Sequence, residues 1–190
     1  MKEYFRPNFW VNTPDINPYH LQGANESMHL IRYALASTLS SNTGVYGPVF
    51  EQMVSEAIVG KEEYLHSEKY EVRHWDWSQE NKITYIISKI NSLRKQNPAL
   101  QQTNLIEFCQ IENDNLIAYL KWNQEKDNII LIVVSLDSYY TQKGMLRIPY
   151  ESVDLYSGQH LSLTDLITND QYDWYDEWNY VELNPTLPFH

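Results

Sequence analysis

The hydrophobic pattern of the chain changes its period near Pro98, and this change limits the folds that are open to it. Before Pro98, apolar residues recur at helical spacing in two long segments. After Pro98, short apolar runs alternate with turn residues, which is typical of β-strands. We therefore expect an α/β part at residues 1–100 and an all-β part at residues 101–190.

The first part alternates strands with helices. The predicted elements are a short buried strand at 9–11, a helix at 26–41, a second strand at 45–50, a long loop at 51–78, and a helix at 79–96 that begins after the cap Ser78. Such alternation indicates parallel strands covered by helices. Two βα units cannot close a barrel of eight strands by themselves.

The second part predicts short strands joined by turns. These strands are expected at 105–111, 116–122, 128–136, 144–148, 152–156 and 180–183. The run at 128–136 is almost continuously apolar, so it predicts a central strand that is covered on both faces. Together the strands predict an antiparallel β-sandwich.

Charge and cysteine content exclude several classes of partner. The net charge of −11 and the pI near 4.9 disfavour nucleic acids and anionic membranes, both of which attract basic surfaces. No apolar run approaches the length of a membrane span, roughly 20 residues. Cys109 is the one cysteine, and the six histidines show no metal-ligand spacing. We expect a cytoplasmic location, because the chain has no disulfide and its start has no signal-peptide stretch. We also expect that the protein binds neither a metal nor a cofactor.

Two polar segments are candidates for a site. Asp15 follows the first predicted strand, where a barrel enzyme places active-site carboxylates, although Pro-Asp is also a common turn pair and spacing alone favours the turn. Residues 60–71 lie in the long loop after the second strand, on the same face as Asp15. Loops of this length are often functional, but a solvated charged surface has the same composition.

Longer motifs carry a resemblance that spacing does not. The segment at residues 6–18 (RPNFWVNTPDINP) resembles the seventh-strand region of maltose-1-phosphate maltosyltransferases, a branch of the α-amylase superfamily. Further segments fit the helix after it, the eighth strand, a loop largely peculiar to this branch, and the last helix: residues 34–40, 45–51, 60–64, 67–71, 73–77 and 93–100. The likeness covers about residues 1–140 and weakens toward the end, where 177–181 still fits. Trp75 and residues 54–59 depart from the family pattern.

The resemblance implies a retaining transferase that moves maltosyl units from α-maltose-1-phosphate to an α-1,4-glucan in a bacterium. Asp15 would be the third catalytic carboxylate, which stabilises the transition state without attacking. Lys69 and Tyr70 would contact the maltosyl donor, and Asn12 would help to orient Asp15. The nucleophile and the general acid would lie on the fourth and fifth barrel strands. We therefore expect a carboxy-terminal fragment of the enzyme that is inactive alone and prone to self-association.

Two alternatives stay open. One is a fragment of another α-amylase superfamily enzyme, a hydrolase or an isomerase. The other is a non-catalytic carbohydrate-binding module, because flat rings stack on sugar faces and the chain has six Trp and fifteen Tyr. The same rings also serve as core packing, which is their commoner role.

Overall fold

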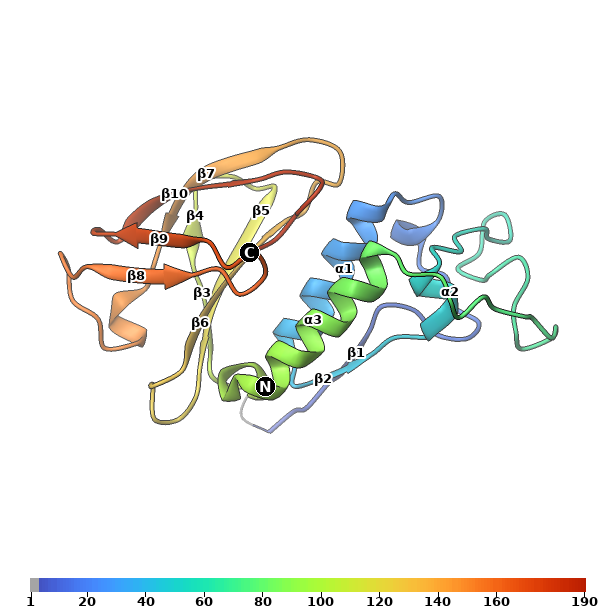
Figure 1. The fold of residues 1–190 in the computed structure, drawn as a ribbon, viewed down its shortest axis with the longest axis horizontal. Helices are drawn as coiled ribbons and strands as arrows, with labels where there is room; N and C mark the ends of the chain where they lie inside the picture. Colours follow the sequence, from blue (N-terminus) through green and yellow to red (C-terminus); the bar gives the residue numbers. More distant parts are fainter. Residues whose placement is uncertain (1–3) are drawn as a thin grey trace.

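A parallel pair of short strands organises the amino-terminal half of the computed structural model, which describes residues 4–190 (Figure 1). β1 (Asn8–Trp10) pairs in parallel with β2 (Asn42–Gly44), and α1 (Glu26–Leu39) connects the two strands. α1 packs against α3 (Lys82–Gln96). The two predicted helices are confirmed, and a parallel strand pair is present, although its second strand is not formed by the predicted residues 45–50. The first domain was predicted from residue 1, and its first three residues lie outside the described part.

β1 is exposed, so the prediction of a buried strand is wrong. Phe9 is 37% exposed and Trp10 is 51% exposed, whereas the next residue, Val11, is buried in the core. Within residues 4–190, β2 is the strand that pairs with β1, and its Gly44 lies under the Trp10 ring, where a β carbon would overlap the indole. Apolar character alone therefore does not tell whether a neighbouring strand covers the segment.

The second predicted strand lies three residues too late in the sequence. Residues 42–44 form β2, and the predicted strand residues enter a short helix, α2 (Gly47–Glu51). Pro48 sits in the first turn of α2, where its missing N–H costs nothing. Val49 and Phe50 point into the core from this turn. The apolar run is thus buried as a helix and not as a strand.

α3 begins three residues later than predicted, with a different cap. The Asn81 side chain accepts a hydrogen bond from the Thr84 amide, and the Thr84 hydroxyl is within 3.2 Å of the Asn81 amide, which completes a capping box. Ser78, the predicted cap, instead donates to the Asp76 carboxylate in the preceding loop. A serine before an apolar stretch is therefore a weaker signal than the reciprocal pair.

Replacing Asn81 by Ala is expected to lower the free energy of unfolding by about 1 kcal/mol, because two amide groups at the start of α3 lose their partners. Urea unfolding followed by circular dichroism measures this difference. Ser78→Ala is the matched control and is expected to change stability by a few tenths of a kcal/mol at most. A larger effect at Ser78 than at Asn81 would contradict the assigned cap.

The carboxy-terminal half is antiparallel throughout its strand ladders, which is consistent with the predicted β-sandwich. Its strands are β3 (Ile106–Phe108), β4 (Gln110–Ile111), β5 (Leu116–Trp122), β6 (Ile129–Ser135), β7 (Gln142–Arg147), β8 (Leu161–Thr164), β9 (Gln171–Trp174) and β10 (Trp178–Leu183). The sheet orders are β3-β5-β6, β10-β7-β4 and β8-β9. Three short 3₁₀ helices complete the elements: Tyr19–Leu21, Pro98–Gln101 and Tyr150–Ser152.

Two strand predictions in this half need correction, and two strands were missed. The strand predicted at 105–111 is split at Cys109, because the chain there crosses from the β5 sheet to the β7 sheet. The strand predicted at 152–156 is absent from the described residues, because Pro149 opens a 3₁₀ helix and Asp154 takes a positive φ of 59°. β8 and β9 were missed, because their side chains are mostly exposed and polar.

β6 is covered on both faces, as predicted, but it is the last strand in the order β3-β5-β6 and not the predicted central strand. Ile132 and Val134 join the core cluster that contains α1 and α3, whereas Val133 packs with Leu146 and Leu183 of the second sheet. β5 pairs along one edge of β6, and the last residues of the chain hydrogen-bond along the other. The largest core cluster therefore contains residues from both halves.

Two cations cap the carboxyl end of α1. Lys121 of β5 is fully buried, and its ammonium donates to the Thr38 carbonyl at 2.7 Å. The Arg94 guanidinium donates to the carbonyls of Ser37, Ser40 and Ser41. Cations at this end of a helix complement its dipole and satisfy its free carbonyls. Burial, with Arg94 nearby, nevertheless lowers the pKa of Lys121 to about 8.

Candidate functional site

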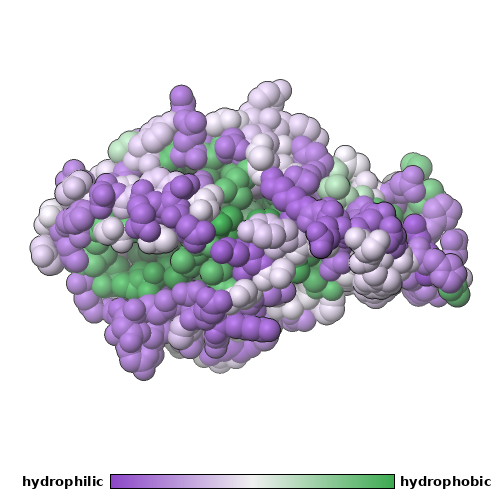
Figure 2. Space-filling view, in the orientation of Figure 1, coloured by the Kyte–Doolittle hydropathy of each residue, from purple (hydrophilic) through white to green (hydrophobic). Residues whose placement is uncertain are grey.

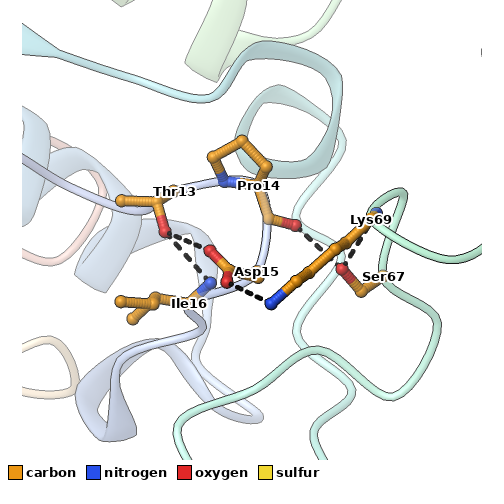
Figure 3. A network of polar contacts seen from close by, with 6 residues as sticks. All are labelled: Thr13, Pro14, Asp15, Ile16, Ser67 and Lys69. Carbon is orange, nitrogen blue, oxygen red and sulfur yellow. Dashed lines mark hydrogen bonds and ion pairs between the residues drawn. The ribbon is translucent and has the colours of Figure 1, made fainter.

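The turn after β1 presents Asp15 toward solvent. The Thr13 hydroxyl donates to Asp15 Oδ1 at 3.2 Å and accepts from the Ile16 amide at 3.1 Å, so one side chain fixes both the turn and the carboxylate (Figure 3). Pro14 begins the bend between them. Asp15 is thus a turn residue and an exposed carboxylate at once, and the two readings of the sequence do not exclude each other.

Lys69 and Tyr70 reach this turn from the long loop. Lys69 Nζ lies 3.3 Å from Asp15 Oδ2, and both side chains are about half exposed (Figure 3). The same ammonium lies 5.3 Å from the centroid of the Tyr70 ring. Residues that are 54 positions apart in sequence therefore meet at one place, and an exposed carboxylate, ammonium and phenol stand together.

The electrostatics of this cluster keep its charged groups charged. The hydrogen bond from Lys69, followed by the one from Thr13, lowers the pKa of the Asp15 carboxyl. The hydrogen bond to Asp15 likewise raises the pKa of Lys69. An ionised carboxylate accepts hydrogen bonds from hydroxyl groups, and an ammonium and a phenol can donate them. The arrangement is suited to a polyhydroxylated ligand.

Asn12 lies beneath the turn and contacts other residues. It is buried, its Nδ2 donates to the Tyr46 carbonyl and to the Tyr64 hydroxyl, and its Oδ1 accepts from the Tyr46 amide. The side chains bonded to the Asp15 carboxylate are those of Thr13 and Lys69. Asn12 therefore joins the end of β1 to the β2–α2 connection and to the loop, and its hydrogen bonds are made below the carboxylate.

The loop at residues 52–81 lacks long regular structure and is held by specific hydrogen bonds. Ser67 Oγ donates to the Pro14 carbonyl at 3.1 Å and accepts from the Lys69 amide at 3.2 Å. The Glu68 carboxylate accepts from the Tyr46 hydroxyl and, at 2.9 Å, from Trp75 Nε1. Sequence reasoning assigned no role to Thr13, Ser67 or Glu68. Ser67 and Glu68 directly precede Lys69 in a motif that resembles the family loop, and that position was the available signal.

An apolar cavity, separate from the Asp15 cluster, lies between the helices and the β half. Its volume is about 610 Å³, and Figure 2 shows it as a hydrophobic recess between hydrophilic rims. Its walls come from α1, α3, β6, β8, β9 and β10, and Asp15, Lys69 and Tyr70 are not among its lining residues. No sequence pattern predicted it, because its walls are distant in the chain.

Asp165 and His190 are a hydrogen-bonded pair among the polar residues of this wall. His190 Nδ1 lies 2.5 Å from Asp165 Oδ2. Burial acts to raise the pKa of Asp165, but hydrogen bonds from His190, Ile167 and Thr168 outweigh it and lower the pKa to about 2. His190, with the Ile167 amide and the Thr168 hydroxyl, thus supplies hydrogen bonds to the buried Asp165 carboxylate.

No helix in residues 4–190 is long and apolar enough to cross a membrane. No group of three or more His, Cys, Asp or Glu residues in the same part is arranged to hold a metal ion.

The fold of the chain is similar to part of several solved structures. A maltogenic α-amylase AmyB from Thermotoga neapolitana superimposes with a TM-score of 0.66 and 12% identity over 95% of this chain and 40% of that protein. AmyP E221Q in complex with maltotriose gives a TM-score of 0.65 and 15% identity over 97% of this chain and 40% of that protein. At these identities the comparison concerns the fold alone.

Sequence comparison is more specific. The chain is 46% identical over its whole length to the α-1,4-glucan:maltose-1-phosphate maltosyltransferase of Chlorobaculum tepidum and 47% identical over 99% of its length to that of Methylacidiphilum infernorum. Residues 108–190 match the family model described as GLGE, C-terminal. The chain is therefore a homologue of the carboxy-terminal part of these maltosyltransferases, and the resemblance seen in its motifs is confirmed. It spans 29% and 28% of the length of the two relatives.

Proposed function

We propose that this chain forms the carboxy-terminal part of an enzyme that transfers maltosyl units from α-maltose-1-phosphate to α-1,4-glucan with retention. The observation that carries the proposal is the meeting of Asp15, Lys69 and Tyr70, with 3.3 Å between Lys69 Nζ and Asp15 Oδ2. The names of the relatives supply the donor and the acceptor.

Asp15 serves this reaction as the third carboxylate. Retaining transfer uses a nucleophile and an acid/base carboxyl and passes through an oxocarbenium-like transition state. An ionised Asp15 accepts hydrogen bonds from hydroxyls of the reacting sugar, and such bonds strengthen as positive charge develops on the ring. Its lowered pKa is consistent with this role, because the carboxylate stays charged well below neutral pH.

Lys69 and Tyr70 serve the donor away from the reacting bond. Contacts of that kind hold a substrate in the geometry that the chemistry needs. Asn12 supports them indirectly, because it fixes the Tyr46 backbone to the end of β1. The nucleophile and the general acid are assigned to other barrel strands, so the 190-residue chain is expected to be inactive.

Within the proposed enzyme, residues 1–100 are the end of the catalytic barrel and residues 101–190 are a β-sandwich domain packed on it. The parallel β1–β2 pair with α1 and α3 supports the first assignment, and the antiparallel ladders support the second. Exposed Phe9 and Trp10 give the isolated chain an apolar surface through which it self-associates. The enzyme acts on α-glucan in the cytoplasm.

The test is maltosyl transfer by the full-length protein that carries this segment. With α-maltose-1-phosphate and a maltooligosaccharide acceptor, the full-length protein is expected to release phosphate and lengthen the acceptor, whereas the 190-residue chain is expected to do neither. Phosphate release by the isolated chain would overturn the assignment of the missing carboxyls. Cleavage of maltooligosaccharide by the full-length protein without the phosphate donor would favour a hydrolase.

A further inference from the structure

We propose that Ser67 and Glu68 are positioning residues that hold Lys69 against Asp15. This inference rests on the proposed function and adds two residues to its site. Both residues immediately precede Lys69 in the loop, and each is bonded to a different neighbouring segment.

Ser67 joins the two halves of the site through one hydroxyl. It is 8% exposed, its Oγ donates to the Pro14 carbonyl, and the same Oγ accepts from the Lys69 amide (Figure 3). Pro14 is the residue directly before Asp15. One oxygen of a buried residue, Ser67 Oγ, thus links the backbone next to Asp15 to the backbone of Lys69.

Glu68 fixes the other side of the same short segment. Its Oε2 accepts from the Tyr46 hydroxyl and its Oε1 accepts from Trp75 Nε1. The hydrogen bond to Glu68, together with burial, raises the pKa of Tyr46 to about 12. The Tyr46 backbone is itself bonded at both N–H and C=O to Asn12. Glu68 therefore ties the loop to the frame from which the Asp15 turn departs.

The ion pair cannot supply this order itself. Lys69 and Asp15 are 52% and 43% exposed in their side chains, and exposed ion pairs are screened and lose side-chain entropy. The loop from residue 52 to residue 81 has no helix or long strand to stiffen it. The Ser67 and Glu68 hydrogen bonds are partly buried, and a partly buried polar group that loses its partner has a real cost, so these contacts determine where Lys69 lies.

The test measures kcat/KM for α-maltose-1-phosphate in the full-length protein. Ser67→Ala is expected to lower it about 10-fold or more, since a small misplacement of a binding group has such an effect. Ser67→Thr keeps the hydroxyl and is expected to recover most of the activity. Ser78→Ala, an exposed serine of the same loop bonded to Asp76, is the matched control and is expected to match wild type.

Two readouts separate positioning from general weakening of the fold. Lys69 is the charged side chain bonded to Asp15, and its hydrogen bond lowers the pKa of Asp15. Ser67→Ala is therefore expected to shift the acid limb of the pH profile to higher pH, as Lys69→Met does. The double variant Ser67→Ala/Lys69→Met is expected to be no worse than Lys69→Met alone, because both changes remove the same interaction. Additive losses, or an unmoved acid limb, would overturn the inference.

Glu68→Gln gives an independent test if Ser67→Ala folds poorly. The glutamine keeps the size of the side chain but replaces one of the two acceptor oxygens by a donor nitrogen. It is expected to lower kcat/KM and to move the acid limb as Ser67→Ala does, and wild-type behaviour in both would contradict the role of Glu68. A full-length wild-type protein without maltosyl transfer would instead refute the proposed function.

Discussion

Replacing Asp15 by Asn in the full-length protein is expected to lower kcat for maltosyl transfer by about 10³-fold, the upper part of the range for one preorganised electrostatic contact to a transition state. The amide keeps the shape of the side chain and can still accept one hydrogen bond, but it has no negative charge to oppose the developing oxocarbenium ion. KM for the donor is expected to change much less, because Lys69 and Tyr70 remain. Steady-state phosphate release measures both constants.

Asp76→Asn is the control for this substitution. Asp76 is a carboxylate of the same loop whose pKa is also lowered, in this case by hydrogen bonds from Ser78. It is bonded to Ser78 and not to the Asp15 cluster, so its variant is expected to keep wild-type kcat. A loss of less than tenfold in Asp15→Asn would contradict the assignment of Asp15 as the stabilising carboxylate.

The second large effect is a rise in stability with pH that depends on Lys121. Its folded-state pKa of about 8 lies below the ordinary lysine value of 10.5, so the unfolded chain binds a proton that the folded chain has lost between these pH values. The free energy of unfolding therefore increases through this window, by about 3 kcal/mol if the whole shift is expressed. Below pH 8 the stabilisation is absent, because both states are then protonated.

Lys121→Met is expected to abolish this increase. Cys109, Tyr33 and Tyr119 have raised pKa values and act in the opposite direction at high pH, but they are present in both proteins and cancel in the difference. Urea unfolding of wild type and Lys121→Met at several pH values from 7.5 to 10 measures that difference. Lys143→Met, at an exposed lysine of β7, is the control and is expected to follow wild type. Equal pH slopes for all three proteins would contradict the buried ammonium.

The long regular elements could be predicted because burial repeats along them. The buried residues of α3 fall on one apolar face at helical spacing, whereas α1 is buried around most of its circumference, with apolar residues recurring along it. β5 matches its predicted range, 116–122, and the apolar run in β6 correctly indicated burial on both faces. In these segments local periodicity and tertiary packing agree.

Short elements could not be predicted in the same way. The run at residues 45–50 is apolar in either conformation, and the preceding residues 42–44 pair with β1 although their side chains are polar or absent. β8 and β9 pair with each other through backbone hydrogen bonds, and each has only 4 residues, so the alternation in β8 is too short to mark a strand. Strand pairing depends on what lies beside the segment, which a single stretch of sequence does not contain.

The site shows the same division. Asp15 and the segment 60–71 were candidates from their positions in the chain, the family resemblance singled out Lys69 and Tyr70, and the structure places Lys69 against Asp15 with Tyr70 beside it. Spacing alone could not do this, because the contact joins residues far apart in the chain. Ser67 donates to the backbone carbonyl of Pro14. Because every residue has a backbone carbonyl, the residue type at position 14 could not predict this hydrogen bond.

The core shared by the two halves has a practical consequence for recombination between homologues. Tyr119 of β5 hydrogen-bonds Thr38 of α1 at 2.5 Å, and Val134 and Phe189 belong to the same cluster as Phe50. A crossover near Pro98 would set the side chains of one parent against the helices of another in the middle of this cluster. A chimeric enzyme that takes the helices and the β half from one parent keeps every one of these contacts.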